Sequence, residues 1–136
     1  MRLSTHLGFT GQCEEAFKLY EKTLGGKIQM MMTYGNSPMA DQFPADFHNK
    51  IMHVSMLVDG QVLMGADAPP GRGAKPQGFT VAISVSDTSQ AERIFNTLAE
   101  GGQVQMPLQQ TFWAKKFGML IDRFGTPWMV NAGENQ

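Results

Sequence analysis

The sequence predicts an α+β protein built from two βαβββ modules, and three observations support this fold class. First, the order of strand, helix and turn signals in residues 1–68 recurs in residues 79–136. Second, each half contains one amphipathic helix that ends at a pair of glycines. Third, the segment between the halves, PPGRGAKPQG at 69–78, is typical of a linker. Because each module is small, we expect the two to pack as one structural domain, within the chain or across a dimer.

In the first half, a helix is predicted from about Gln12 to Leu24, because its apolar residues recur at i, i+3, i+4 and i+7. The segment 35–49 contains two prolines and is predicted to be a long loop, a type that often binds a ligand or forms a lid. Asp59-Gly60 is a strong signal for a tight hairpin turn. The strands predicted in this half are 3–9, 27–34, 50–58 and 61–66.

The second half repeats this pattern. Asp87 is predicted to cap a helix, with Gln90 completing a capping box, and Gly101-Gly102 end that helix. The two helices are about 75 residues apart, and the hairpin glycines, Gly60 and Gly125, are 65 residues apart. The strands predicted here are 79–86, 103–108, 117–121 and 126–130.

The composition excludes several classes of protein. Apolar residues make up 42% and charged residues 17%, which is typical of a folded globular chain. With 11 basic against 12 acidic residues, no excess of positive charge indicates a nucleic-acid partner. No apolar run is long enough to span a membrane, and the start lacks a signal peptide, so we expect a cytoplasmic protein. The single cysteine, Cys13, excludes an internal disulfide framework and is predicted to be a buried, inert thiol.

Four segments carry a resemblance to a known family: LGFTGQCEEAFKLYEKTLGG (7–26), KIMHVSMLVDGQVLMGAD (50–67), LAEGGQVQMPL (98–108) and FGMLIDRFGTPWMVN (117–131). Through them the chain resembles the PhnB-like subfamily of the vicinal oxygen chelate superfamily, which includes glyoxalase I, the bleomycin- and fosfomycin-resistance proteins and the extradiol dioxygenases. The resemblance spans nearly the whole chain. It implies paired βαβββ modules that each curl a sheet around a cavity, and, as in resistance-type relatives, a homodimer.

The resemblance also locates four positions where metal-dependent members carry His, Gln or Glu, on the first and last strands of each module. Such ligands hold a divalent ion that chelates two substrate oxygens. Here the four positions fall on Thr5, Met64, Val81 and Met129, none of which is an ordinary ligand for a hard divalent ion. A one-residue slip would replace Thr5 by His6, on the opposite face of the strand. We therefore expect no metal and no cofactor, and we expect the four residues to line an apolar cavity.

Other side chains are candidates for the same cavity. His53 lies within a predicted strand, and an imidazole there could act as a base or as a ligand. Trp113 lies in the loop QTFWAKK, whose aromatic and basic residues suit an anionic or aromatic ligand. If the family's register holds, Met129 points into the cavity and the adjacent Trp128 points toward the helix. Asp122 flanks a turn, where aspartate is ordinary.

Two function classes follow from these residues. The first is a metal-independent protein that binds a small apolar or aromatic molecule, favoured by the 11 methionines and the missing ligand set. The second is an enzyme of the lyase, isomerase or dioxygenase type, metal-free or binding a metal through other residues such as His53, Asp67 and His6. Nothing in the chain supports a methyltransferase, because no glycine-rich strand-turn-helix for a methyl-donor nucleotide is present. Neither a nucleic-acid nor a membrane partner is expected.

Overall fold

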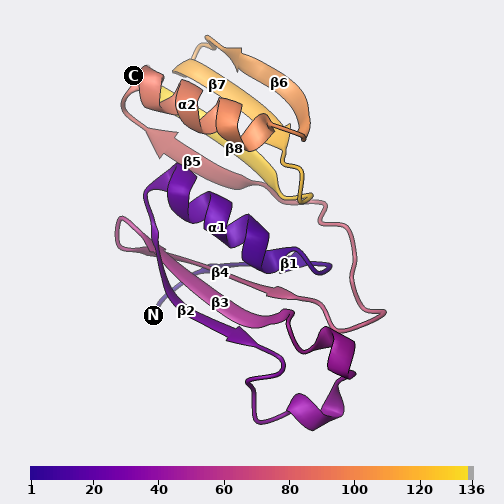
Figure 1. The fold of residues 1–136 in the computed structure, drawn as a ribbon. Coiled ribbons are helices and arrows are strands. Elements are labelled where there is room, and N and C mark those ends of the chain that lie inside the picture. The colour runs from indigo at the N-terminus through magenta and orange to yellow at the C-terminus, as the bar shows by residue number, and fades with distance from the viewer. Residues whose placement is uncertain (135–136) are drawn as a thin grey trace. The chain divides into compact units, whose positions relative to one another are not determined.

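The computed structural model describes residues 1–134 and divides into two compact units, Met1–Ala74 and a second that begins at Lys75 (Figure 1). Each unit contains one four-stranded sheet with one α-helix packed on a single face. The two units have the same order of elements, βαβββ, which confirms the fold class and the internal repeat predicted from the sequence.

The first unit has the strand order β1-β4-β3-β2, in which β1 runs parallel to β4 and the other neighbours are antiparallel. Two short 3-10 helices, Ala40–Gln42 and Ala45–Phe47, lie in the long loop after β2. The main elements are β1 (Thr5–Phe9), α1 (Cys13–Leu24), β2 (Lys27–Thr33), β3 (Ile51–Val58) and β4 (Gln61–Asp67).

The second unit repeats this topology with the order β5-β8-β7-β6, and again only the first strand, β5, runs parallel to its neighbour. Its last two strands are longer than the sequence indicated. As a result, Trp113 immediately precedes β7 instead of lying in the middle of a loop. The elements are β5 (Val81–Val85), α2 (Thr88–Ala99), β6 (Gln103–Gln109), β7 (Ala114–Ile121) and β8 (Pro127–Glu134).

The core of each unit lies between its helix and the facing side of the sheet. In the first unit, Phe17 of α1 packs edge-on against Phe9 of β1 and lies so close to Gly65 of β4 that a Cβ there would meet its ring at 2.5 Å. In the second unit, Phe95 of α2 lies at the same kind of contact with Gly118 of β7. The predicted apolar stripes of both helices are buried, as amphipathic packing requires.

The turn signal and the predicted N-cap of α2 are confirmed, but α2 ends at the extended residue Glu100, one position before the predicted glycine pair. Asp59 and Gly60 both have positive φ, 48° and 79°, which is the geometry of a tight hairpin turn with mirror-image twist. Gly25 adopts the left-handed conformation that ends α1. Asp87 caps α2, but its carboxylate accepts from the amide of Ser89 rather than from that of Gln90.

Candidate functional site

Each sheet presents one face to its helix and a second face that points away from it, which we call the distal face. Since side chains alternate along a strand, the register assigns every strand residue to one of these faces. The first distal face includes His6, Gly8, Met30, Met32, His53, Ser55, Leu57, Val62, Met64 and Ala66. The second distal face includes Ala82, Ser84, Lys115, Phe117, Met119, Ile121, Met129 and Asn131.

The structure does not bring the four residues at the family's ligand positions together on the distal faces. Met64 and Met129 lie there, but Thr5 pairs with buried Leu63, and Val81 pairs with buried Trp128, on the helix-covered faces. The transferred positions on both first strands are therefore one residue away from the distal face. Alternation could have revealed this, because Leu7 and Phe9 share the parity of Thr5 and are plainly core residues.

The residues that do face Met64 and Met129 are His6 and Ala82. With this register the four positions offer one imidazole, two thioethers and a methyl group, without a carboxylate. That donor set does not fit a hard divalent ion, which prefers imidazole and oxygen ligands. Across residues 1–134, no group of three or more histidine, cysteine, aspartate or glutamate side chains is placed to hold a metal ion.

The two histidines of the first distal face lie near each other. The His6 and His53 ring centroids are 6.5 Å apart with an interplanar angle of 23°. Strand β4 separates them and presents Met64 beside His6 and Ala66 beside His53, and the small residues Gly8 and Ala66 leave room for the rings. His6 is exposed and His53 is half-buried, so a ligand can reach both rings.

The second distal face carries an aromatic ledge, which consists of Phe112, Trp113 and Phe117. The Trp113 ring lies edge-on to Phe117, with centroids 5.2 Å apart, and Phe112 lies edge-on to Trp113 at 4.7 Å. Phe112 is 88% exposed and Trp113 is 39% exposed. Sequence reasoning selected Trp113 but missed Phe117, whose pairing with Asn131 sets it on the same face as Met119 and Met129.

Asp67, at the end of β4, is a structural anchor. It is 1% exposed, and its carboxylate accepts hydrogen bonds from the amides of Gly11 (2.8 Å), Cys13 (3.0 Å) and Ile51 (2.9 Å). Its carbonyl oxygen accepts from the Tyr34 hydroxyl at 2.6 Å. One side chain thus ties together the loop before α1 and the start of β3.

Two groups beside Asp67 are shifted toward their neutral forms. Burial, reinforced by the negative charges of Asp67 and Glu14, raises the pKa of the Cys13 thiol far above its ordinary value. Burial, with a smaller contribution from Asp67, also raises the pKa of the Tyr34 phenol. The predicted burial of Cys13 is confirmed, and its neutral thiol is a poor nucleophile.

Asp122 anchors the second unit in a different way. Its carboxylate accepts from the amides of Phe124 and Thr126 and from the indole N–H of Trp128, each at 2.9 Å. Trp128 is 1% exposed and points toward the helix layer, as expected from alternation, while Met129 points to the distal face. Asp122 is therefore committed to the turn before β8.

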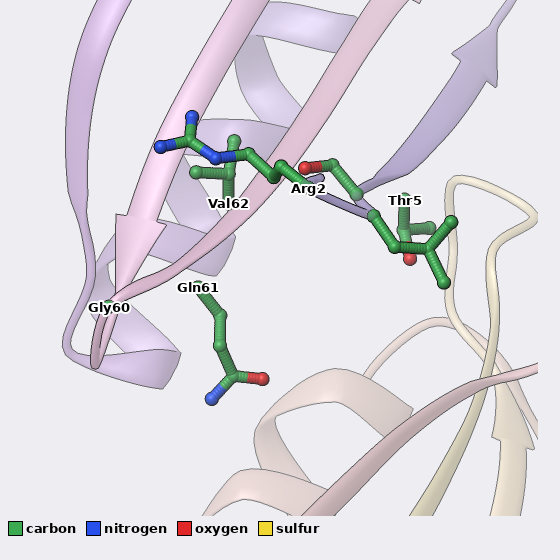
Figure 2. Close-up of a pocket in the computed structure, with 7 residues that line it drawn as sticks. Arg2, Thr5, Gly60, Gln61 and Val62 are labelled. Carbon is green, nitrogen blue, oxygen red and sulfur yellow. The ribbon is translucent and has the colours of Figure 1, made fainter.

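A pocket of about 220 Å³ lies at the edge of the first sheet, where the chain before β1 passes the β3–β4 hairpin (Figure 2). Thr5 is the predicted site residue that borders it. Arg2 supplies its charged side chain, as Figure 2 shows. The residues that line the pocket are Arg2, Leu3, Ser4, Thr5, Gly60, Gln61 and Val62.

Within residues 1–134, no helix is long and apolar enough to cross a membrane. Both α-helices have 12 residues, against about 20 required for a bilayer span.

The paired βαβββ fold, with two sheets whose distal faces lack a hard-metal ligand set, is that of a PhnB-like member of the vicinal oxygen chelate class. The sequence model of the family described as 3-demethylubiquinone-9 3-methyltransferase matches residues 1–131. The chain is 34% identical over 147 residues to protein YjdN from Escherichia coli (strain K12), covering 100% of this chain and 98% of that protein. The chain therefore belongs to this family.

Solved structures share this fold. Protein PA1353 from Pseudomonas aeruginosa is 43% identical, with a TM-score of 0.91 and 99% of each chain covered. A Bacillus cereus PhnB protein, titled a putative 3-demethylubiquinone-9 3-methyltransferase, is 24% identical, with a TM-score of 0.81 and coverage of 97% of this chain and 99% of that one. A glyoxylase/bleomycin resistance protein/dioxygenase domain from Frankia sp. EAN1pec shares the fold at 13% identity, with a TM-score of 0.63 and coverage of 97% and 94%.

Proposed function

We propose that this protein binds a small apolar or aromatic molecule at the distal faces of its sheets, without a metal or a cofactor. The observation that carries the proposal is the aromatic ledge beside Met119 and Met129. A partly exposed indole packed against a second ring offers a flat apolar surface for a ligand ring. The thioethers next to it can adapt to ligands of different shape.

The experiment is a calorimetric titration of the purified full chain with 2-naphthoate, a planar aromatic anion. Binding is expected, and Trp113→Ala should weaken it by at least tenfold because the variant loses the exposed indole face. Phe79→Ala is the matched control, since Phe79 is another exposed aromatic residue of the same unit, 43% accessible, and lies outside the ledge. Binding that Trp113→Ala leaves unchanged would contradict a role for the ledge.

We also propose that the protein is a cytoplasmic homodimer. One helix covers one face of each sheet, and the distal faces carry apolar residues such as Met64 and Phe117 that a second layer would shield from water. Native mass spectrometry of protein purified without added metal or chelator tests the proposed dimer directly. Two chains per particle are expected, and a monomer at micromolar concentration would contradict the proposal.

A second candidate function rests on the His6–His53 pair. Two imidazoles 6.5 Å apart on one face can place an acid and a base on either side of a small substrate, as an isomerase or lyase requires. The test is deuterium uptake from D₂O into pyruvate, an enolisable probe. Uptake above the buffer rate that is lost in both His6→Asn and His53→Asn would favour the enzyme. Uptake at the buffer rate would exclude proton abstraction from this class of carbon acid.

A further inference from the structure

We infer that the side-chain carbonyl of Asn131 is the polar recognition group of the second distal face, and that the ligand is a planar aromatic molecule with an N–H or O–H donor on its edge. This inference rests on the proposed function and deepens it by naming the ligand class. The observation that supports it is a hydrogen-bond acceptor that no donor reaches. The Asn131 Oδ1 atom is buried, and no hydrogen-bond partner reaches it in the described part of the chain.

An unpaired buried carbonyl is unusual, because most buried polar atoms in folded proteins have a hydrogen-bond partner. The hydroxyl of Ser84, on the residue directly opposite in β5, makes no hydrogen bond to it. The cost of desolvating this oxygen is recovered when a ligand supplies the missing donor. An unpaired acceptor of this kind is therefore expected in a ligand-binding site.

The position of Asn131 relative to the aromatic ledge defines the shape of the ligand. Asn131 pairs directly with Phe117 across β7 and β8, and Phe117 contacts Trp113. Paired residues in an antiparallel sheet have Cα atoms only about 5 Å apart. A ring that lies against Phe117 and Trp113 therefore lies beside Asn131, and a rotation of the carboxamide would present Oδ1 to a donor on the edge of the ring.

The repeat itself shows that the fold does not require this amide. Asn131 pairs with the second-last residue of the parallel strand β5, Ser84, just as Ala66 pairs with Gly8 of β1 in the first unit. The same βαβββ topology thus forms with a methyl group in place of the carboxamide. The amide of the second unit is a local addition to the distal face, beside the aromatic ledge.

Lys115 gives the proposed site a preference for negatively charged ligands. Its side chain packs against Gly133, so close that a Cβ at Gly133 would meet the lysine Cδ at 2.8 Å, and the residue is exposed. A flexible ammonium group at the margin of the site favours a negatively charged substituent. The ligand class is therefore an aromatic or heteroaromatic acid with a ring N–H or a hydroxyl group.

Two probes of nearly identical shape test the inference. Indole-2-carboxylate has a ring N–H, and benzofuran-2-carboxylate has an oxygen atom in its place. Titration calorimetry on the wild-type chain should give about tenfold tighter binding of the indole, because only its N–H satisfies the carbonyl. This comparison needs no variant and so does not depend on the folding of a mutant.

The variant Asn131→Leu should bring the affinity for the indole down to that for the benzofuran and leave the benzofuran affinity within about twofold. Asn96→Leu is the matched control, since Asn96 is an exposed amide on α2, the element on the other face of the same sheet. It should keep the tenfold preference for the indole.

The outcomes separate this inference from the proposed function. If the wild-type chain binds both probes equally well, Asn131 does not select a donor, while an aromatic site remains. If Asn131→Leu folds and keeps the preference for the indole, the donor is recognised elsewhere and the inference is wrong. If neither probe binds, both the inference and the proposal of an aromatic ligand are contradicted.

Discussion

The two units share one topology but are held together by different aspartates. In the first unit, Asp67 bonds to amides 16, 54 and 56 positions away in the sequence, so it connects distant elements. In the second unit, Asp122 bonds to groups two to six positions away and stabilises one turn with its neighbouring strand. The repeat therefore specifies where the strands and helices lie. The hydrogen bonds that hold the loops differ between the two units.

The distal faces differ in the same manner. The first carries two histidines on either side of β4, and the second carries the aromatic ledge with Asn131. The helix-covered faces, by contrast, match closely, since Phe17 on Gly65 corresponds to Phe95 on Gly118. Core packing tolerates few changes, because density is high there and each methyl group matters. The distal faces are where the two repeats carry different chemistry.

The largest effect expected is that of Asp67→Ala. The change leaves the amides of Gly11, Cys13 and Ile51 without their acceptor, in surroundings that are mostly buried. Because each unpaired group costs roughly 1 kcal/mol or more, the loss is expected to be about 3 kcal/mol in the free energy of unfolding. Urea denaturation followed by circular dichroism measures it. A loss below about 1 kcal/mol would mean that Asp67 does not anchor the first unit.

Asp122→Ala is expected to destabilise the second unit by about 2 kcal/mol, less than Asp67→Ala. The turn of residues 122–126 is local, so its backbone can rearrange to find new hydrogen bonds more easily than the distant elements that Asp67 joins. The buried indole N–H of Trp128 also loses its acceptor, so the tryptophan emission spectrum should change in the folded state. An effect larger than that of Asp67→Ala would reverse the comparison between the two anchors.

The double change Asp59-Gly60→Ala-Ala should lower stability by about 1 kcal/mol or more. Both residues have positive φ, which alanine adopts only with strain. Its matched control is Gln61→Ala, which adjoins the turn at the start of β4 without occupying its left-handed positions. An unchanged denaturation midpoint for the double variant would show that the hairpin does not depend on this turn.

Replacing Cys13 by alanine is expected to have the smallest effect on stability at neutral pH. In alkaline solution, however, Cys13 makes the stability of the protein depend on pH. Its thiol pKa is raised in the folded protein, so only the unfolded chain releases this proton when the pH rises above 9.0, the ordinary pKa of the thiol. Stability is therefore lost as pH rises, by about 1.4 kcal/mol per pH unit above 9. Denaturation of wild-type protein and of Cys13→Ala between pH 8 and 10.5 measures the difference in slope. Equal slopes would contradict a shifted thiol.

Much of the fold followed from the sequence because its signals are local. Gly25 ends α1, Asp59-Gly60 forms the expected hairpin, and the apolar stripes of α1 and α2 are largely buried. The exceptions are also local in origin. The loop at 35–49 contains two short 3-10 helices, where Phe43 and Phe47 pack against Tyr34. Strand β7 begins three residues earlier than predicted.

The candidate site was less accessible to sequence reasoning. Trp113, His53, Met64 and Met129 were selected, but the first-strand positions fell on Thr5 and Val81 instead of their neighbours on the distal faces. Counting from a helix across a loop does not fix strand parity, and an error of one residue moves a side chain to the other face. Phe117 and Asn131 were missed because their pairing across β7 and β8 is a tertiary fact.

The sequence by itself determined the class of fold, the repeat, the helix ends and the burial of Cys13, because periodicity, glycine conformation and side-chain size act over a few residues. Tertiary structure alone decided which side chains meet on each distal face, why Asp67 is an anchor and where a buried acceptor lacks a donor. Those properties depend on strand register and on residues far apart in the chain, and no local pattern encodes them.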